Sequence, residues 1–354
     1  MDQQFVFSKV KLKLTMTKKL IVFAFLSIIT LTGCDFVKGF KGNATKDGFV
    51  YIPRGANFNQ VLDSIKPYLK NIEEFKKYAE SADYPATIKP GKYKIEAEES
   101  SASIIDRLQG GQQEEVKLRI KNEPTLYHMV GSVSRQVNVD STALVTSIME
   151  WAKAKDSTLN EETVKQYFIP ETHNVYWSLT PEKFIERMET QYNKVWNADR
   201  LAKAKAMNMT PLEVTTLASI VQLESSDHEE DQKAVAKAYL NRLAADMRLE
   251  ADPTSIYAHK LENGFDKKVQ RVYKKLTWSH NAYNTYRNKG LPPAPICLPN
   301  VQMIDAVLNP ADHEFIYFAA DPDRPGYHSF AKTFEEHKKN ADKYREWVKK
   351  NNIK

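Results

Sequence analysis

The sequence predicts an α+β protein with an N-terminal membrane anchor or lipoprotein signal, a small domain of strands and helices, and a larger mixed α+β domain. Three observations support this organisation: an apolar run follows two lysines, two strand-then-helix patterns come next, and longer helical patterns fill the rest. The expected parts are the anchor over 1–34, a polar tether over 35–47, the small domain over 48–115 and the larger domain over 116–345. With 354 residues and 42% hydrophobic content, the chain can bury two cores.

The N-terminal pattern is typical of an exported protein. Lys18 and Lys19 precede an apolar run of about a dozen residues, which matches the core of a secretory signal and is short for a spanning helix. The run ends in Leu31-Thr32-Gly33-Cys34, which resembles a bacterial lipobox and predicts lipidation of Cys34. An uncleaved membrane helix is the alternative, and Met16 is an alternative start. Both alternatives tether the chain to the cell membrane, with its main body outside the cytoplasm.

Charge and cysteine usage narrow the function classes. The formal net charge of +6 suits an acidic polymer or an anionic lipid surface, and it is too modest to predict nucleic-acid binding. Once Cys34 is assigned to the anchor, Cys297 has no partner, so no disulfide framework is expected. The run His228-Glu229-Glu230-Asp231 is followed by Gln232, where a zinc protease helix needs its second histidine. We therefore expect no metal and no cofactor.

The small domain contains two similar patterns, each a strand followed by a capped helix. The first places a strand at 49–52 and a helix capped by Asn57 or Asn59. The second places a strand after the turn at Pro90-Gly91 and a helix that ends at Gly110-Gly111.

The larger domain begins with a strand pattern and continues mostly as helices. The expected elements are a strand over 116–120, helices over 122–130 and 141–152, a long helix over 181–205 and a charged C-terminal helix over 332–349. The aromatic spacing within the long helix is typical of core packing.

Residues 217–226 form the most informative helical pattern. Leu217, Ile220 and Val221 share one helical face with Glu224, which predicts a carboxyl group that leaves water for a partly apolar wall. A desolvated carboxyl has a raised pKa and can act as a general acid near neutral pH, for example toward a glycosidic oxygen. The alternative is an ordinary amphipathic helix that ends in an acid.

Polar positions follow in the next segments. Asp252 before Pro253 is the preferred start of a short helix, with Asp252 as the N-cap. This capping role does not exclude contact of Asp252 or Thr254 with a ligand. The proline-rich loop over 282–299 is expected to be stiff, and its Asn284 and Tyr286 offer groups suited to sugar rings. The alternative is a surface loop whose tyrosines cover the core.

A strand is expected at 315–319, and a loop carries the chain from it to His328. An isolated histidine is either a packed, hydrogen-bonded residue or a substrate contact, and both interpretations stay open here.

Four blocks stand in order along the chain: LASIVQLES, VAKAYLNRLAADMRLEADPTSIY, AYNTYRNKGLPPAPICLPN and FIYFAADPDRPGYHSF. Together they resemble the signature blocks of the endolytic murein transglycosylase (YceG-like) family. That family's catalytic acid is the second Glu of an E-K-E triplet, so the resemblance assigns it to Glu224. Gln222 departs from the triplet, and His173-Asn174 departs from the family's F-P-D-T-Y block.

The resemblance also implies substrate-binding positions and a domain type. The substrate-binding positions are Asn241, Arg242, Asp252, Thr254, Tyr257, Asn284, Tyr286 and His328. Residues 48–115 resemble the LysM-like domain of the family, which either binds glycan here or only positions the larger domain.

The implied activity is endolytic, non-hydrolytic cleavage of nascent peptidoglycan strands. A single acid is enough when the muramyl C6 hydroxyl is the nucleophile, because it closes a 1,6-anhydro ring between C6 and C1 without water. Such an enzyme terminates glycan elongation and has peptidoglycan synthases as neighbours. The alternative class is a non-catalytic, wall-binding lipoprotein scaffold in which Glu224 only caps or packs.

Overall fold

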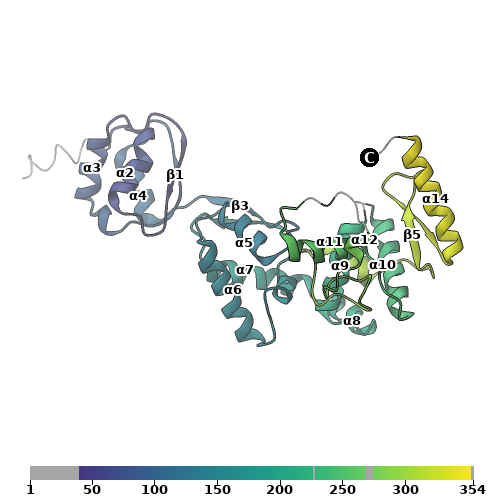
Figure 1. The fold of residues 1–354 in the computed structure, drawn as a ribbon. Helices are drawn as coiled ribbons and strands as arrows, with labels where there is room; N and C mark the ends of the chain where they lie inside the picture. The colour runs from purple at the N-terminus through teal and green to yellow at the C-terminus, as the bar shows by residue number, and fades with distance from the viewer. Residues whose placement is uncertain (1–39, 226–227, 268, 270–273, 352–354) are drawn as a thin grey trace, which may run out of the picture. The chain divides into compact units, whose positions relative to one another are not determined.

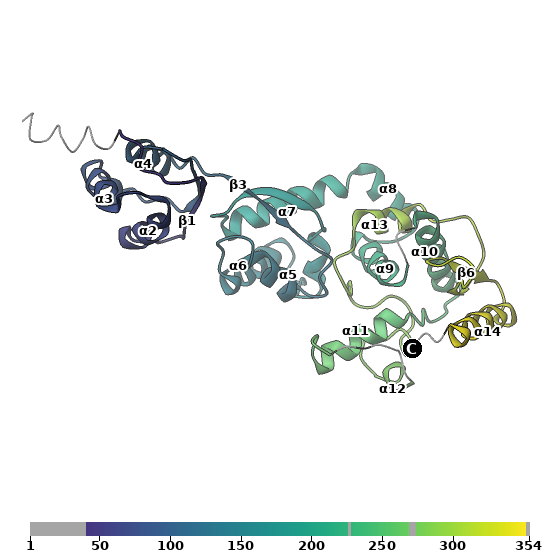
Figure 2. The same cartoon turned by 90° about the horizontal axis from the view of Figure 1, so that it is seen from above.

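The computed structural model describes residues 40–225, 228–267, 269 and 274–351 (Figures 1 and 2). Unit 1 comprises the described residues up to Val116 together with Val175–Ser178, and unit 2 comprises Lys117–Asn174 and the chain from Leu179 onward. The expected anchor, including Cys34, lies outside the described residues. Within the described ranges, no helix has both the length and the apolar character needed to cross a bilayer.

Unit 1 is built on a two-stranded antiparallel sheet. Its elements are β1 (Gly48–Ile52), α2 (Phe58–Ile65), a 3₁₀ turn (Lys66–Tyr68), α3 (Ile72–Ser81), a second 3₁₀ turn (Tyr84–Ala86), β2 (Gly91–Ile95) and α4 (Ser101–Gly110). β1 pairs with β2 from Gly48 opposite Ile95 to Ile52 opposite Gly91. The inward side chains of both strands pack with α2, α3 and α4 in one core, so the predicted strand-then-helix patterns are confirmed.

The helix ends of unit 1 follow the capping rules. Asn57 caps α2 in a reciprocal box with Gln60, which decides between the two expected asparagines. Ser100 caps α4, and Gly111 ends it in the left-handed region with φ of 68°. These caps satisfy backbone groups that each helix leaves unpaired.

The segment expected to be a polar tether is partly folded into unit 1. Asn43 is 2% exposed, and its Nδ2 donates to the Asn71 carbonyl and to Ser101 Oγ, both at 2.9 Å. Asn43 Oδ1 accepts from the Asn71 backbone at 2.8 Å, and Ala44 is fully buried in the core. The tether assignment is therefore wrong for 40–47, because a fully bonded amide can be buried at little cost.

The remaining elements run from β3 to the C-terminal helix. They are β3 (Glu115–Arg119), α5 (Leu126–Ser134), α6 (Ser141–Lys155), a 3₁₀ turn (Thr163–Tyr167), β4 (Thr172–Tyr176), α7 (Pro181–Val195), α8 (Ala198–Ala206), α9 (Pro211–Glu224), α10 (Glu229–Ala244), α11 (Asp252–Asn263), α12 (Lys274–Thr277), α13 (Val301–Leu308), β5 (Tyr317–Ala320), β6 (His328–Ala331) and α14 (Phe334–Lys350). β3 pairs with β4.

Two helix predictions need correction. The long helix expected over 181–205 is α7 followed by α8, because Trp196 leaves helical geometry and Asn197 caps a new helix. The helix expected over 122–130 begins later, since Thr125 after Pro124 is its N-cap. α13 was not anticipated from the sequence.

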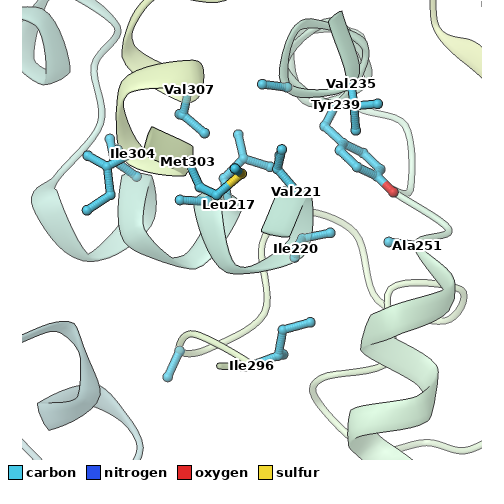
Figure 3. Packing of buried hydrophobic residues seen from close by; sticks show 14 of the residues in the cluster. Leu217, Ile220, Val221, Val235, Tyr239, Ala251, Ile296, Met303, Ile304 and Val307 are labelled. Atoms are coloured by element: carbon cyan, nitrogen blue, oxygen red, sulfur yellow. The ribbon is translucent and has the colours of Figure 1, made fainter. Parts of the chain in front are cut away.

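The central part of α9, residues 214–221, is buried on all sides, where the sequence predicted a single apolar face. Every residue from 214 to 221 is buried, because α10, α11 and α13 surround the helix. Figure 3 shows Met303 and Val307 of α13 packed near α9 and Ile296 of the proline-rich loop on another side. Ser219 Oγ accepts from the Ile296 backbone at 2.9 Å, which attaches that loop to α9. The helix that leads to Glu224 is therefore rigidly held.

A two-stranded sheet and α14 close the C-terminal end of unit 2. β5 pairs antiparallel with β6, from Tyr317 opposite Ala331 to Ala320 opposite His328. α14 packs on both strands and lies beside β5 in Figure 1. Thr333 and Glu336 form a reciprocal box that fixes the start of α14.

Candidate active site

Glu224 is the last residue of α9, and its position is set by the packing of that helix. A reciprocal box between Thr210 and Glu213 fixes the start of the helix, and the buried residues fix its course. Glu224 Oε2 is buried without a hydrogen-bond partner among the described residues. An unsatisfied buried carboxyl oxygen is costly in its charged form, so this position favours the neutral acid.

The surroundings of Glu224 tune its acidity. Burial raises the pKa of Glu224 to about 7, and the negative charge of Asp252 acts in the same direction. His328 and a hydrogen bond from Tyr239 act in the opposite direction and limit the rise in pKa. At neutral pH this carboxyl group can therefore both give and take a proton.

Tyr239 supplies the hydroxyl that contacts Glu224. The residue is 1% exposed, and burial together with the charge of Glu224 raises the pKa of Tyr239 well above its ordinary value. Figure 3 shows its hydroxyl pointing away from α10 toward Ala251, which precedes Asp252. The phenol therefore stays protonated and acts as a donor to the carboxylate.

Asp231 holds His328 through both carboxylate oxygens. Oδ1 accepts from the His328 backbone and Oδ2 contacts His328 Nδ1, each at 2.8 Å. The Asp231 side chain is 1% exposed and the His328 side chain 13%, so the pair is largely withdrawn from water. Because a carboxylate only accepts, Nδ1 carries the proton and Nε2 is the ring nitrogen left for other partners.

The sequence prediction missed Asp231, although a signal was present. Asp231 lies four residues before Val235 and seven before Ala238, so it shares the buried face of α10. An acid on such a face needs a specific partner, which here is His328. Within the described part of the chain, no group of three or more His, Cys, Asp or Glu side chains is placed to hold a metal ion.

Asp252 and Tyr286 form a second polar pair near Glu224. The Tyr286 hydroxyl donates to Asp252 Oδ1 at 2.6 Å. Burial raises the pKa of Tyr286, and the bond to Asp252 and the charge of Glu224 raise it further. The expected N-cap role of Asp252 is wrong: Ala251 occupies the cap, and Asp252 is the first helical residue with its carboxylate bonded to the phenol.

Asn241 and Arg242 use their polar groups to hold the segment that leads into β5. Asn241 Nδ2 donates to the carbonyls of His313 and Phe315, both at 3.0 Å. Arg242 is 7% exposed, and its Nε donates to the Ile316 carbonyl at 2.6 Å. These bonds give both residues a structural role, and the substrate contacts expected at Asn241 and Arg242 stay a prediction.

Thr254, Tyr257 and Asn284 are buried and bonded inside the protein, and the substrate contacts expected at them stay a prediction. Thr254 Oγ1 contacts Thr285 Oγ1 at 2.7 Å, and Thr254 is fully buried. Tyr257 is 3% exposed, and its hydroxyl donates to Glu162 Oε2 at 2.8 Å. Asn284 is fully buried and donates to the backbone carbonyls of Thr277, the last residue of α12, and of Ser279. Aromatic and amide side chains are typical of sugar-binding sites, but here their polar groups form hydrogen bonds inside the protein.

Glu224 and His328 share a cavity of about 290 Å³. Its other walls come from the turn between β5 and β6, including Pro322 and Tyr327, and from α14, including Trp347. The structure thus brings Glu224 and His328 together at one cavity. Asp231 orients His328, and the pair of Asp252 and Tyr286 lies near Glu224. Their contact with substrate stays a prediction.

The sequence model of the YceG-like family matches residues 50–343, which is most of the chain. The chain belongs to the YceG-like family. As a YceG-like protein, it shares its fold with a putative YceG-like protein from Listeria monocytogenes. That structure has a TM-score of 0.56 and 23% identity, and the match covers 83% of this chain and 98% of the other.

Two curated relatives of this YceG-like chain are named endolytic murein transglycosylase. The Streptococcus pneumoniae protein is 26% identical over 337 residues, covering 87% of this chain and 60% of the relative. The Bacillus subtilis protein is 31% identical over 163 residues, covering 46% of this chain and 42% of the relative. The chain thus spans about three fifths of the streptococcal relative, so that relative's full activity is not transferred by similarity alone.

Proposed function

We propose that this YceG-like protein is an endolytic murein transglycosylase, a lyase that cuts peptidoglycan strands between N-acetylmuramic acid and N-acetylglucosamine. The observation that carries the proposal is Glu224, a buried carboxyl with a pKa of about 7 at the wall of a cavity. The names of the curated relatives support the same substrate class.

The proposed reaction uses one carboxyl group twice. Protonated Glu224 gives its proton to the glycosidic oxygen as the bond between that oxygen and muramyl C1 breaks. The carboxylate then takes the proton of the C6 hydroxyl as that oxygen bonds to C1, which closes the 1,6-anhydro ring and restores the acid. The donor hydroxyl of Tyr239 stabilises the transient carboxylate, and the charge of Asp252 keeps it basic.

The direct test is to digest purified peptidoglycan glycan strands and separate the products by mass. We expect anhydro-muramyl ends from cuts within the strands. Products with reducing ends would instead show that the protein is a hydrolase. Strand binding without any cleavage would favour the non-catalytic scaffold instead.

The activity should depend on pH through Glu224. The first step needs the protonated acid, so kcat/KM is expected to be highest below pH 7 and to fall about tenfold per pH unit above it. Initial rates of anhydro-end formation between pH 5 and 9 measure this dependence. A rate that stays constant up to pH 9 would contradict the assigned role.

We also propose that the N-terminal segment tethers the protein to the cell membrane, with the enzyme outside the cytoplasm and peptidoglycan synthases as neighbours. The basic and apolar pattern that ends at Cys34 supports this, with lipidation as the first expectation. Unit 1 is then a LysM-like domain that either binds glycan or positions unit 2. Intact mass of membrane-extracted protein tests the anchor: a non-lipidated species that starts at Met1 or Met16 excludes lipidation.

A further inference from the structure

Two aromatic side chains of α14 border the same cavity as Glu224. Tyr344 and Trp347 are three residues apart, so they lie on one face of the helix. Their rings are stacked, with centroids 5.9 Å apart and planes at 23°. Both side chains are partly exposed and line the cavity, although α14 is otherwise rich in charged residues. This leaves an aromatic surface open to the space that Glu224 faces.

Contacts on two sides hold this surface in place. The α14 end nearer β5 is fixed by stacking of His337 on Tyr317, with centroids 5.3 Å apart. Nearer the aromatic pair, Lys343 forms an ion pair with Asp323 in the turn between β5 and β6. That turn lines the cavity too, so helix and turn form one continuous wall.

We propose that Tyr344 and Trp347 form an aromatic platform that binds one N-acetylhexosamine ring of the glycan strand beside the linkage that Glu224 protonates. The inference rests on the proposed function and adds a substrate-positioning surface to it. The platform supplies the apolar contact, while Glu224 and His328 supply polar groups from the rest of the cavity wall.

The size and the lining of the cavity suit a single sugar ring. Its volume of about 290 Å³ is just below the roughly 300 Å³ at which small-ligand pockets start. A pyranose ring has an apolar face and polar edges, and aromatic rings bind such faces while excluding water. The wall that carries the platform also includes Pro322 and Pro325, which add apolar surface without backbone donors.

The test measures binding separately from cleavage. In a Glu224→Gln background, calorimetry follows peptide-free oligomers of alternating N-acetylglucosamine and N-acetylmuramic acid. Trp347→Ala is expected to weaken binding roughly tenfold, and Trp347→Phe to recover most of it, because an aromatic face is restored. Tyr344→Ala should weaken binding in the same direction. Phe334→Ala is the matched control, since Phe334 is a 64% exposed aromatic at the other end of α14.

The outcomes separate the platform from the proposed function. Unchanged affinity in folded Trp347→Ala and Tyr344→Ala overturns the platform, as does an equal loss in Phe334→Ala. Failure of the unmodified protein to cleave, together with Trp347-dependent binding, refutes the lyase and supports the platform. Thermal unfolding of each variant shows whether it is folded, and Tyr344→Ala provides the test if Trp347→Ala is not.

Discussion

Glu224→Gln is expected to lower the release of anhydro-muramyl ends by about 10²- to 10⁴-fold while glycan binding is retained. Glutamine has nearly the same shape but has no acidic proton to give, and loss of a positioned acid costs about this much. Mass-resolved digestion of glycan strands measures the effect. Glu335→Gln is the matched control, because Glu335 is an exposed acid on α14 outside the cavity.

The same substitution should raise stability above neutral pH. The folded-state pKa of Glu224, about 7, is above the unfolded value of about 4.3, so holding the carboxylate destabilises the fold as pH rises through 7. Glu224→Gln removes that ionisation. The unfolding free energy of the variant minus that of the unmodified protein is therefore expected to be about 1–3 kcal/mol larger at pH 8 than at pH 5. Urea unfolding at both pH values measures it. A variant that is inactive and also less stable at pH 8 would point to misfolding and not to a lost acid.

Lys165→Met is expected to lower the free energy of unfolding by about 3 kcal/mol at pH 7. Lys165 is fully buried, and its Nζ donates to Tyr257 at 2.7 Å and to Glu162 at 2.8 Å. Removing the ammonium leaves the Glu162 carboxylate without its cation. Because the Glu162 side chain is 32% exposed, we place the loss at the lower end of values for buried pairs.

A double variant separates the ion pair from general packing. The charge of Lys165 and hydrogen bonds from Tyr257 and Tyr283 outweigh burial and hold the pKa of Glu162 below its usual range. The ionised Glu162 carboxylate should therefore stabilise the fold at neutral pH, and this stabilisation should be lost as the pH falls below about 4. Glu162→Gln combined with Lys165→Met should cost less than the sum of the single changes. Lys153→Met, at an exposed lysine, is the control, and additive costs in the double variant would contradict the coupling.

The local sequence patterns predicted much of the fold and the central acid. The strands of unit 1, a cap at one of two asparagines, and the helix that leads to Glu224 follow from periodicity and capping preferences. The end of α7 could not be predicted in this way, because the aromatic spacing of the expected long helix continues through Trp196.

The walls of the site were harder to predict, because residue type does not reveal which polar groups are already bonded. Arg242 and Asn284 look like ligand-binding residues, yet backbone carbonyls take their donors. Asp231 looks like part of an acidic surface run, yet it fixes His328. The aromatic pair of α14 is hidden in a mostly charged sequence, and only the folded chain brings Trp347 to the cavity of Glu224.

The burial of residues 214–221 in α9 has a consequence for how this scaffold can change. Because every side chain from 214 to 221 is confined by neighbours, mutational libraries aimed at new glycan preferences should leave that helix untouched. Diversity belongs instead at the exposed positions 323–326 of the turn between β5 and β6, which lie outside the packed core around α9. Variable positions and positions needed for stability thus lie in different segments of unit 2.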